Sequence, residues 1–317
     1  MNAGRKLKVG VIGVGSLGQW HARVYSELPS AELVGVHDVN EQRASEIARR
    51  YRTRAFARME DLAAQTEALS VVVPSDLHCK IASLLMERGI HLLVEKPIAS
   101  STSDAESMVA LARQKGLILQ VGHVERFNPV LGALEGALSE PRFIEAVRLA
   151  PYPPPREGSA PRGTEVSVVL DLMIHDLEIL LHLVRSPVRD LHAVGVPVLS
   201  PSEDIANVRL TFENGCVANV TASRVSQERT RKIRVFQPDT YVSLDYEKQS
   251  GHLYRKVGAG IARSDVPIEK GEPLQNELAS FVQCVLTRGE PIVSGRQAAD
   301  ALKLAVDICH HIRQGGS

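Results

Sequence analysis

The stretch that decides the fold is KVGVIGVGSLG, which runs from Lys8 to Gly18. Its first part is a short apolar run that suits a buried strand, and Gly13, Gly15 and Gly18 follow at once. In a strand–turn–helix unit the first glycine makes a tight turn and the second lets a diphosphate approach the backbone. The third glycine allows close helix packing, and the N-terminus of the helix attracts the anion. The stretch therefore predicts a dinucleotide site, which also includes Ser16 and Leu17.

Four further short apolar runs follow in the first 122 residues: Glu32–His37, Leu69–Val73, His91–Val94 and Leu117–Val121. Runs that are apolar on both faces are typical of buried parallel strands. Between them, apolar residues recur every three or four positions, which indicates helices. The alternation predicts an α/β Rossmann domain with a doubly wound parallel sheet over residues 1–122.

The pattern changes after Gly122. A cap-and-proline pair, Asn128-Pro129, predicts a helix to about Leu138, and a second helix is expected from about Thr164 to Val184. The remaining pattern predicts strands at 142–149, 191–198, 205–212, 216–223, 232–236 and 241–246, then helices near 274–287 and 296–313. Residues 123–317 are therefore expected to form an α+β domain with a largely antiparallel sheet. The C-terminal helix either stays with this domain or packs back on the first domain.

Composition excludes several classes. Lys plus Arg equals Asp plus Glu at 37 each, so no positive field favours nucleic acid or anionic membranes. No apolar run is long enough for membrane insertion, and the N-terminus lacks a signal-peptide pattern. The four cysteines have no metal-ligand spacing, and His310-His311 has no further ligand at suitable spacing. We expect a cytoplasmic protein with reduced thiols and no metal site.

Asp38 ends the second predicted strand, 20 residues after Gly18. A carboxylate at this position accepts hydrogen bonds from the ribose hydroxyls of NAD and repels the 2′-phosphate of NADP. The next residues, Val39, Asn40 and Glu41, include no cation. The sequence therefore favours NAD over NADP.

Three residues suit the oxidation of an alcohol. Lys96 follows the strand that ends at Val94, so it should project beyond the carboxyl edge of the sheet, where open sheets bind ligands. Asp171 and His175 are four residues apart and share one helical face. Histidine can take a hydroxyl proton near neutral pH, and an ammonium can stabilise the alkoxide that develops. Asp171 could orient His175 or hold a substrate hydroxyl.

Together these motifs resemble the Gfo/Idh/MocA oxidoreductases over nearly the whole chain. The matching segments are Gly13–Gly18, Pro74–His78, Glu95-Lys96-Pro97, Asp171–His175 and Val293-Ser294-Gly295. The resemblance implies an NAD-dependent dehydrogenase acting on CH–OH groups, with Lys96, Asp171 and His175 as its catalytic group. It also implies a homodimer or homotetramer, because the exposed sheet face of this family commonly packs against other copies.

The resemblance extends the cofactor site beyond the glycine loop and Asp38. It adds Pro74, Ser75, His78, Glu95, Lys96 and Pro97, and implies that the Lys96–Pro97 bond is cis. Two departures from the family pattern stand out. Ser75 replaces the usual asparagine, which weakens the case for its cofactor contact, and Glu178 replaces the aspartate three residues after the histidine.

Two segments, Gly122–Pro129 and Leu170–Asp176, resemble the branch that contains the UDP-N-acetylglucosamine 3-dehydrogenases. That branch oxidises the sugar 3-hydroxyl to a ketone, which a partner aminotransferase converts to an amine for lipid A with a 2,3-diamino sugar. The resemblance implies a substrate site formed by Lys96, His123, Arg126, Asn128, Asp171 and His175.

Several alternatives stay open. Arg156 and Arg162 either bind a diphosphate or only solvate a loop, and the proline-rich stretch with Tyr152 is either a flap over the pocket or a connector. His123 and Glu125 are equally compatible with structural roles. The substrate is either a nucleotide sugar or a free polyol, inositol or sugar. A non-catalytic NAD-binding regulator is the third hypothesis.

Overall fold

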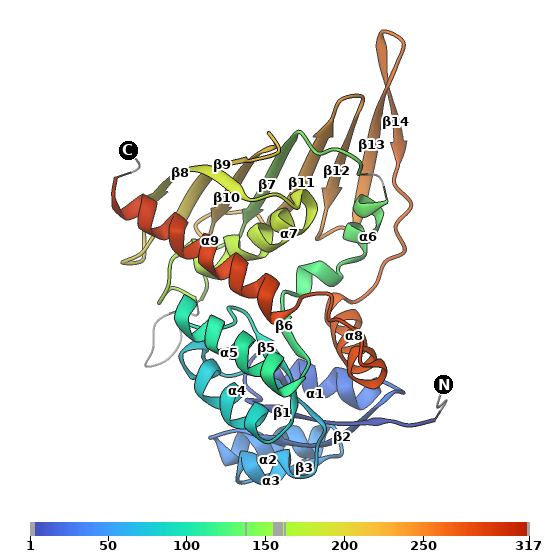
Figure 1. Ribbon diagram of the computed structural model, residues 1–317, viewed down its shortest axis with the longest axis vertical. Coiled ribbons are helices and arrows are strands. Elements are labelled where there is room, and N and C mark those ends of the chain that lie inside the picture. The colour runs from blue at the N-terminus through green and yellow to red at the C-terminus, as the bar shows by residue number, and fades with distance from the viewer. Residues whose placement is uncertain (1–3, 137, 155–160, 162, 316–317) are drawn as a thin grey trace. The chain divides into compact units, whose positions relative to one another are not determined.

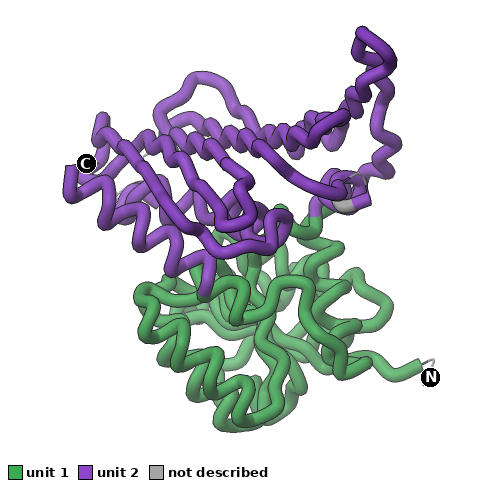
Figure 2. The backbone as a smooth tube through the Cα atoms, turned by 45° about the horizontal axis from the view of Figure 1, so that its top comes forward, with its two compact units in different colours: residues 1–127, 272–299 green, residues 128–271, 300–317 purple. Residues whose placement is uncertain are grey.

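The computed structural model describes residues 4–136, 138–154, 161 and 163–315 (Figure 1). They form two compact units (Figure 2). Unit 1 comprises the described residues within 1–127 and 272–299, and unit 2 those within 128–271 and 300–317. This division differs from the one predicted between residues 122 and 123, because it groups residues 123–127 and 272–299 with the first unit.

Unit 1 contains a six-stranded parallel sheet, which confirms the predicted doubly wound Rossmann fold. Across the sheet the strands are β3 (Arg54–Ala55), β2 (Ala31–His37), β1 (Leu7–Ile12), β4 (Ala68–Val71), β5 (His91–Glu95) and β6 (Leu119–Gly122). The helical segments are α1 (Gly18–Glu27), α2 (Glu41–Arg50), α3 (Met59–Ala63), η1 (Ser75–Leu77), α4 (His78–Glu87), α5 (Thr102–Lys115), η2 (Val124–Phe127) and α8 (Pro273–Thr287). The central strands are almost fully buried, as parallel strands covered on both faces require.

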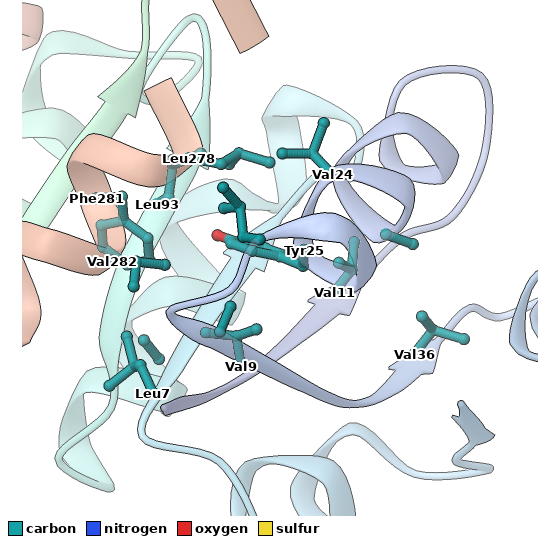
Figure 3. Packing of buried hydrophobic residues seen from close by; sticks show 14 of the residues in the cluster. Leu7, Val9, Val11, Val24, Tyr25, Val36, Leu93, Leu278, Phe281 and Val282 are labelled. Carbon is teal, nitrogen blue, oxygen red and sulfur yellow. The ribbon is translucent and has the colours of Figure 1, made fainter. Parts of the chain in front are cut away.

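The core of unit 1 includes a helix from near the end of the chain. Leu278, Phe281 and Val282 of α8 are buried in one hydrophobic cluster with residues of β1 and α1 (Figure 3). Figure 3 labels these three residues together with other members of the cluster, among them Leu7 and Val24. Burial of this apolar face explains why α8 belongs to unit 1.

Unit 2 contains an eight-stranded sheet in which only β7 (Phe143–Leu149) and β10 (Val217–Ser223) pair in parallel. The other pairs are antiparallel, which confirms the predicted α+β class. Those strands are β8 (Val188–Val196), β9 (Ile205–Phe212), β11 (Thr230–Gln237), β12 (Thr240–Asp245), β13 (Ser250–Val257) and β14 (Gly260–Asp265). Alternating burial, as in β9, gives the sheet one covered face and one that is partly exposed.

The helical segments of unit 2 include η3 (Val169–Met173) and α7 (Ile174–Val184), which carry the predicted catalytic pair. The others are α6 (Pro129–Glu135) and the greater part of α9 (Gly295–Arg313). The helix predicted from about Thr164 begins at Val168 instead. The sequence analysis also missed the β13–β14 hairpin, because β14 is exposed at every position and has no apolar alternation.

Candidate active site

The glycine loop has the geometry that a dinucleotide site requires. Gly13 has a φ of +82°, and a side chain there would collide with the carbonyl oxygen of Val72. A side chain on Gly18 would collide with the carbonyl of Gly13. A Cβ on Gly15 would meet nothing within 4 Å, so the backbone there is open to an approaching diphosphate. Ser16 and Leu17 lie just before α1, whose first turn carries no acidic residue to repel that anion.

Asp38 is joined to the glycine loop. Its Oδ2 accepts the N–H of Val14 at 2.8 Å, and its Oδ1 accepts the N–H of Asn40 at 2.9 Å. Carboxylate oxygens have further lone pairs, so these bonds leave capacity for ribose hydroxyls. Arg43, which the sequence analysis did not consider, donates to the carbonyl of Val14 at 3.1 Å and to Glu46 at 2.8 Å.

His78 lies between two loops at the carboxyl edge of the sheet. Its Nδ1 is 2.9 Å from the carbonyl oxygen of Pro97, and its Nε2 is 2.9 Å from that of Val73. Burial lowers the pKa of His78, so the ring carries one proton to donate. The Lys96–Pro97 bond is cis, as the sequence analysis expected. His78 can therefore donate to only one of these two carbonyl oxygens, although it lies between the loop that carries Pro74 and Ser75 and the loop that carries Lys96.

Glu95 is held in a buried polar cluster behind Lys96. Its Oε1 is 3.1 Å from Nε2 of His21, whose Nδ1 is 3.2 Å from Oγ of Ser70. The hydroxyl of Tyr25 is 2.9 Å from the same Ser70 oxygen. Burial raises the pKa of Glu95, but the hydrogen bond to His21 and the electrostatic interactions with His21 and Lys96 outweigh it, so the pKa lies below its usual value. Glu95 is therefore ionised at neutral pH.

Two residues that the sequence analysis did not assign to the site complete this cluster. A Cβ on Gly122 would lie 3.0 Å from Cδ of Glu95, so the absence of a side chain at this position leaves space for the carboxylate. Glu277 of α8 is fully buried. Burial raises its pKa well above the usual value and the charge of Glu95 raises it further, which favours the protonated, neutral form of Glu277.

His123 and Arg126 follow β6 in unit 1, and both are buried. Burial and the positive charges of Lys96 and Arg126 lower the pKa of His123 to about 3. His123 is therefore neutral at physiological pH, although it lies in the field of two cations. As a neutral ring it can donate one hydrogen bond and accept another.

Asp171 and His175 lie in unit 2, in one continuous helical stretch. Asp171 belongs to the π-helical turn η3, and His175 lies in the first turn of α7. Such π-turns occur often at functional sites. His175 is buried, whereas Asp171 is partly exposed.

A buried ion pair fixes the start of α7. Asp176, which follows His175, accepts from Nε of Arg148 at 2.7 Å and from its Nη2 at 3.1 Å. This two-bond geometry holds α7 against β7 in a single orientation. Glu178 is also buried, on the same helix.

The remaining predicted residues are distributed as follows. Asn128, at the start of unit 2, caps α6 by accepting the N–H of Val130 at 3.3 Å and donates to the carbonyl of Tyr246 at 3.1 Å. Arg156 and Arg162 lie outside the described residues. Lys96 belongs to unit 1 and the Asp171–His175 pair to unit 2, so their convergence on one substrate stays a prediction.

Comparison with known proteins identifies the family. Residues 7–123 match the model described as "Oxidoreductase family, NAD-binding Rossmann fold", and residues 133–239 match the "GFO/IDH/MocA C-terminal domain". A UDP-N-acetylglucosamine 3-dehydrogenase from Acidithiobacillus ferrooxidans is 36% identical over 314 residues, which cover 95% of this chain and 97% of that protein. The chain belongs to the Gfo/Idh/MocA family of oxidoreductases.

Two solved structures agree with this family assignment. That of the UDP-N-acetylglucosamine 3-dehydrogenase from Acidithiobacillus ferrooxidans has a TM-score of 0.92 at 34% identity, over 98% of this chain and 99% of that one. A levoglucosan dehydrogenase in complex with NADH has a TM-score of 0.87 at 18% identity, over 98% of each chain, and shares the fold. The scyllo-inositol 2-dehydrogenase (NAD(+)) of Bacillus subtilis is 23% identical, over 98% of this chain and 95% of that protein.

This Gfo/Idh/MocA enzyme is an NAD-dependent dehydrogenase that acts on CH–OH groups. No helix in the part that the structure describes is long and apolar enough to cross a membrane. Among the same residues, no group of three or more His, Cys, Asp or Glu side chains could hold a metal ion.

Sequence reasoning missed the polar cluster behind Lys96, although a signal was present. His21 and Tyr25 are four residues apart, so they share one face of α1, and both are buried there. Glu277 likewise interrupts the apolar face of α8. Polar residues in an apolar helical stripe indicate buried partners, but the sequence alone does not say which.

Proposed function

We propose that this enzyme oxidises the 3-hydroxyl of UDP-N-acetylglucosamine to a ketone, with NAD as the oxidant. The observation that carries the proposal is the 36% identity, over nearly the full length of both chains, to a UDP-N-acetylglucosamine 3-dehydrogenase. The motifs Gly122–Pro129 and Leu170–Asp176 support it, because their residues fall in the order typical of that branch.

The proposed roles follow from the chemistry of each side chain. Bound NAD supplies the hydride acceptor for the sugar carbon that carries the reacting hydroxyl. The glycine loop, the N-terminus of α1 and Asp38 would hold the diphosphate and the ribose. His175 would take the hydroxyl proton, and Lys96 would stabilise the negative charge that develops on the oxygen.

Asp171, His123, Arg126 and Asn128 complete the proposed substrate site. A buried arginine suits a diphosphate, because its planar guanidinium forms two parallel hydrogen bonds with phosphate oxygens. A neutral His123 can donate to a sugar hydroxyl or accept from one. Asp171, close to His175 in the chain, would orient its ring or hold a neighbouring hydroxyl.

The product of this reaction would be a 3-keto nucleotide sugar. A ketone at this position is the substrate of an aminotransferase, and the amine that results would serve a lipid A with a 2,3-diamino sugar. We therefore propose a cytoplasmic enzyme with a pathway aminotransferase as its partner.

The experiment is a panel of UDP-sugars, free sugars and inositols, each incubated with NAD while NADH formation is recorded. Turnover of UDP-N-acetylglucosamine well above that of all free sugars is the expected result. Turnover of a free polyol or inositol, without turnover or thermal stabilisation by UDP-N-acetylglucosamine, would contradict the proposal. It would instead favour the alternative substrate class.

A further inference from the structure

A buried polar cluster formed by Arg224, Asp204 and their hydrogen-bond partners lies next to the helical stretch that carries Asp171. Arg224 follows the end of β10, is only 2% exposed, and forms an ion pair with the fully buried Asp204 at 2.7 Å. The other carboxylate oxygen of Asp204 accepts the N–H groups of Val198, Leu199 and Ser200 at 2.8, 2.6 and 2.8 Å. Both oxygens of Asp204 are thus used inside unit 2.

The guanidinium of Arg224 donates four further hydrogen bonds. Its Nη1 donates to the carbonyl oxygens of Gly163 at 2.6 Å and Val166 at 2.9 Å. Its Nη2 donates to Oγ of Ser202 and to the carbonyl of Glu203, both at 3.2 Å. A guanidinium has five N–H groups, and these contacts together with Asp204 engage all five. The backbone before η3, at Gly163 and Val166, is therefore hydrogen-bonded to the side chain of Arg224.

Gly163 connects Arg224 to Asp171, because it contacts both residues. It has a φ of +83°, and a Cβ there would collide with Oδ2 of Asp171 and lie 2.9 Å from its Cγ. The backbone of Gly163 therefore packs directly against the carboxyl group of Asp171. The carbonyl of the same residue is the one that Arg224 holds at 2.6 Å.

The same cluster also holds Tyr152, in the proline-rich stretch. The hydroxyl of Tyr152 is 3.0 Å from Oγ of Ser200, and the N–H of Ser200 donates to Asp204. Gly163 is thus bonded directly to the buried ion pair, and Tyr152 is linked to it through Ser200. Burial of such a pair adds little net stability, because desolvation offsets the attraction.

We propose that Arg224, with Asp204, is a positioning residue that fixes the carboxylate of Asp171 through Gly163. The inference rests on the proposed function, which gives Asp171 its place in the site. Loss of the contact would leave Asp171 in the wrong position, and a misplacement of about 1 Å costs about 10²-fold in rate.

The test uses Gly163→Ala in the full-length enzyme, with whichever sugar the wild type oxidises fastest. Gly215→Ala is the matched control, because Gly215 has a φ of +85° but a Cβ there meets nothing within 4 Å. Both variants carry the same backbone strain. We expect Gly163→Ala to lower kcat by about 10²-fold with a smaller change in KM. Gly215→Ala should keep kcat within about twofold.

A second readout separates positioning from mere folding. In an Asp171→Asn background, Gly163→Ala should cause no further loss of kcat, because the two changes act through one carboxylate. Arg224→Lys, which keeps the charge but loses the guanidinium bonds to the carbonyls of Gly163 and Val166, should lower kcat in the same direction. Thermal unfolding of each variant checks that it is folded.

Two outcomes overturn the inference and are distinguishable. If Asp171→Asn abolishes activity while Gly163→Ala behaves like Gly215→Ala, the positioning role is wrong and the proposed function stands. If Asp171→Asn keeps wild-type kcat, the catalytic assignment itself fails, and the positioning role fails with it.

Discussion

At the end of β2, the Asp38 carboxylate accepts one backbone N–H with each oxygen, which fixes its orientation beside the glycine loop. Its place could be predicted from the sequence, because the spacing from the last glycine is a property of the strand–helix–strand unit. The nearby Arg43 could not, since its contact with Val14 depends on how α2 packs.

Asp38→Ala should reduce the preference for NAD over NADP. Loss of charged hydrogen bonds to the ribose costs about 1.5–3 kcal/mol, or about tenfold or more in affinity for NAD. The affinity for NADP should fall less, because the repulsion of its 2′-phosphate also disappears. Titration of both cofactors measures the ratio of their Kd values, and Glu41→Ala, an exposed acid close by, is the control. An unchanged ratio would remove Asp38 from ribose recognition.

Glu277 should make unit 1 less stable as the pH rises. Its folded-state pKa lies above the value of 4.5 expected for the unfolded chain, so folding takes up a proton above that pH. The stabilisation by this proton is fully present below about pH 4.5 and is lost as the pH rises through the folded-state pKa.

Glu277→Gln removes this pH dependence, because the amide stays neutral. The Tm of the variant minus that of the wild type should therefore increase between about pH 5 and pH 8. The exposed acid Glu32 supplies the control, Glu32→Gln, for which we expect a much smaller trend. A difference for Glu277→Gln that stays flat with pH would show that Glu277 is ionised in the folded protein.

Among the elements, the buried parallel strands of unit 1 were the most predictable, since their burial on both faces leaves a continuous apolar run. The exposed two-residue edge strand β3 was not predicted, because it has no such run. The helix α8 was predicted from its periodicity, but its membership of unit 1 was not. An amphipathic pattern shows that one face is buried and does not identify the surface that covers it. The β13–β14 hairpin gave no signal, because its exposed strands need no apolar alternation.

The contribution of α8 can be measured with Phe281→Ala. Removal of this fully buried ring should cost about 3–5 kcal/mol of unfolding free energy. Trp20, the single tryptophan of the chain, lies on α1, so its fluorescence reports the unfolding of unit 1. Gln283→Ala, on the exposed side of α8, is the matched control. If both variants unfold at the same denaturant concentration, α8 is not part of this core.

For the whole molecule, the exposed face of the unit 2 sheet is the surface through which we expect copies to associate. Four aromatic residues lie side by side across neighbouring strands: Phe143, Phe236, Tyr241 and Tyr254. Their successive ring centroids are 5.7, 5.0 and 4.1 Å apart. A row of aromatic rings on a partly exposed face is typical of an interaction surface.

Val147→Arg, on the same face, should therefore convert a homodimer or homotetramer into a smaller species. Val147 pairs with Lys232 and Thr221, so the new charge would lie beside an existing cation. Light scattering after size exclusion measures the mass, and Val39→Arg, on a 96% exposed residue of unit 1, is the control. A wild-type monomer would contradict the expectation.

The residues of the candidate site could be proposed one by one from the sequence, because each motif has its own physical reason. Its assembly could not, because Lys96 and His175 belong to different units and their convergence depends on tertiary placement. The sequence analysis missed the buried residues Arg224 and Glu277 for a related reason. A buried charged residue shows in the sequence at most as a polar position in an apolar stretch, and only the fold shows what it contacts.

The central claim is that the carbon bearing the 3-hydroxyl of UDP-N-acetylglucosamine gives up its hydrogen as hydride to NAD. The most direct measurement incubates the enzyme and NAD with substrate that carries deuterium at C3 and analyses the reduced cofactor by mass spectrometry. We predict one deuterium in each reduced nicotinamide and a ketone at C3. Unlabelled NADH, or no reduction of NAD, would contradict the claim.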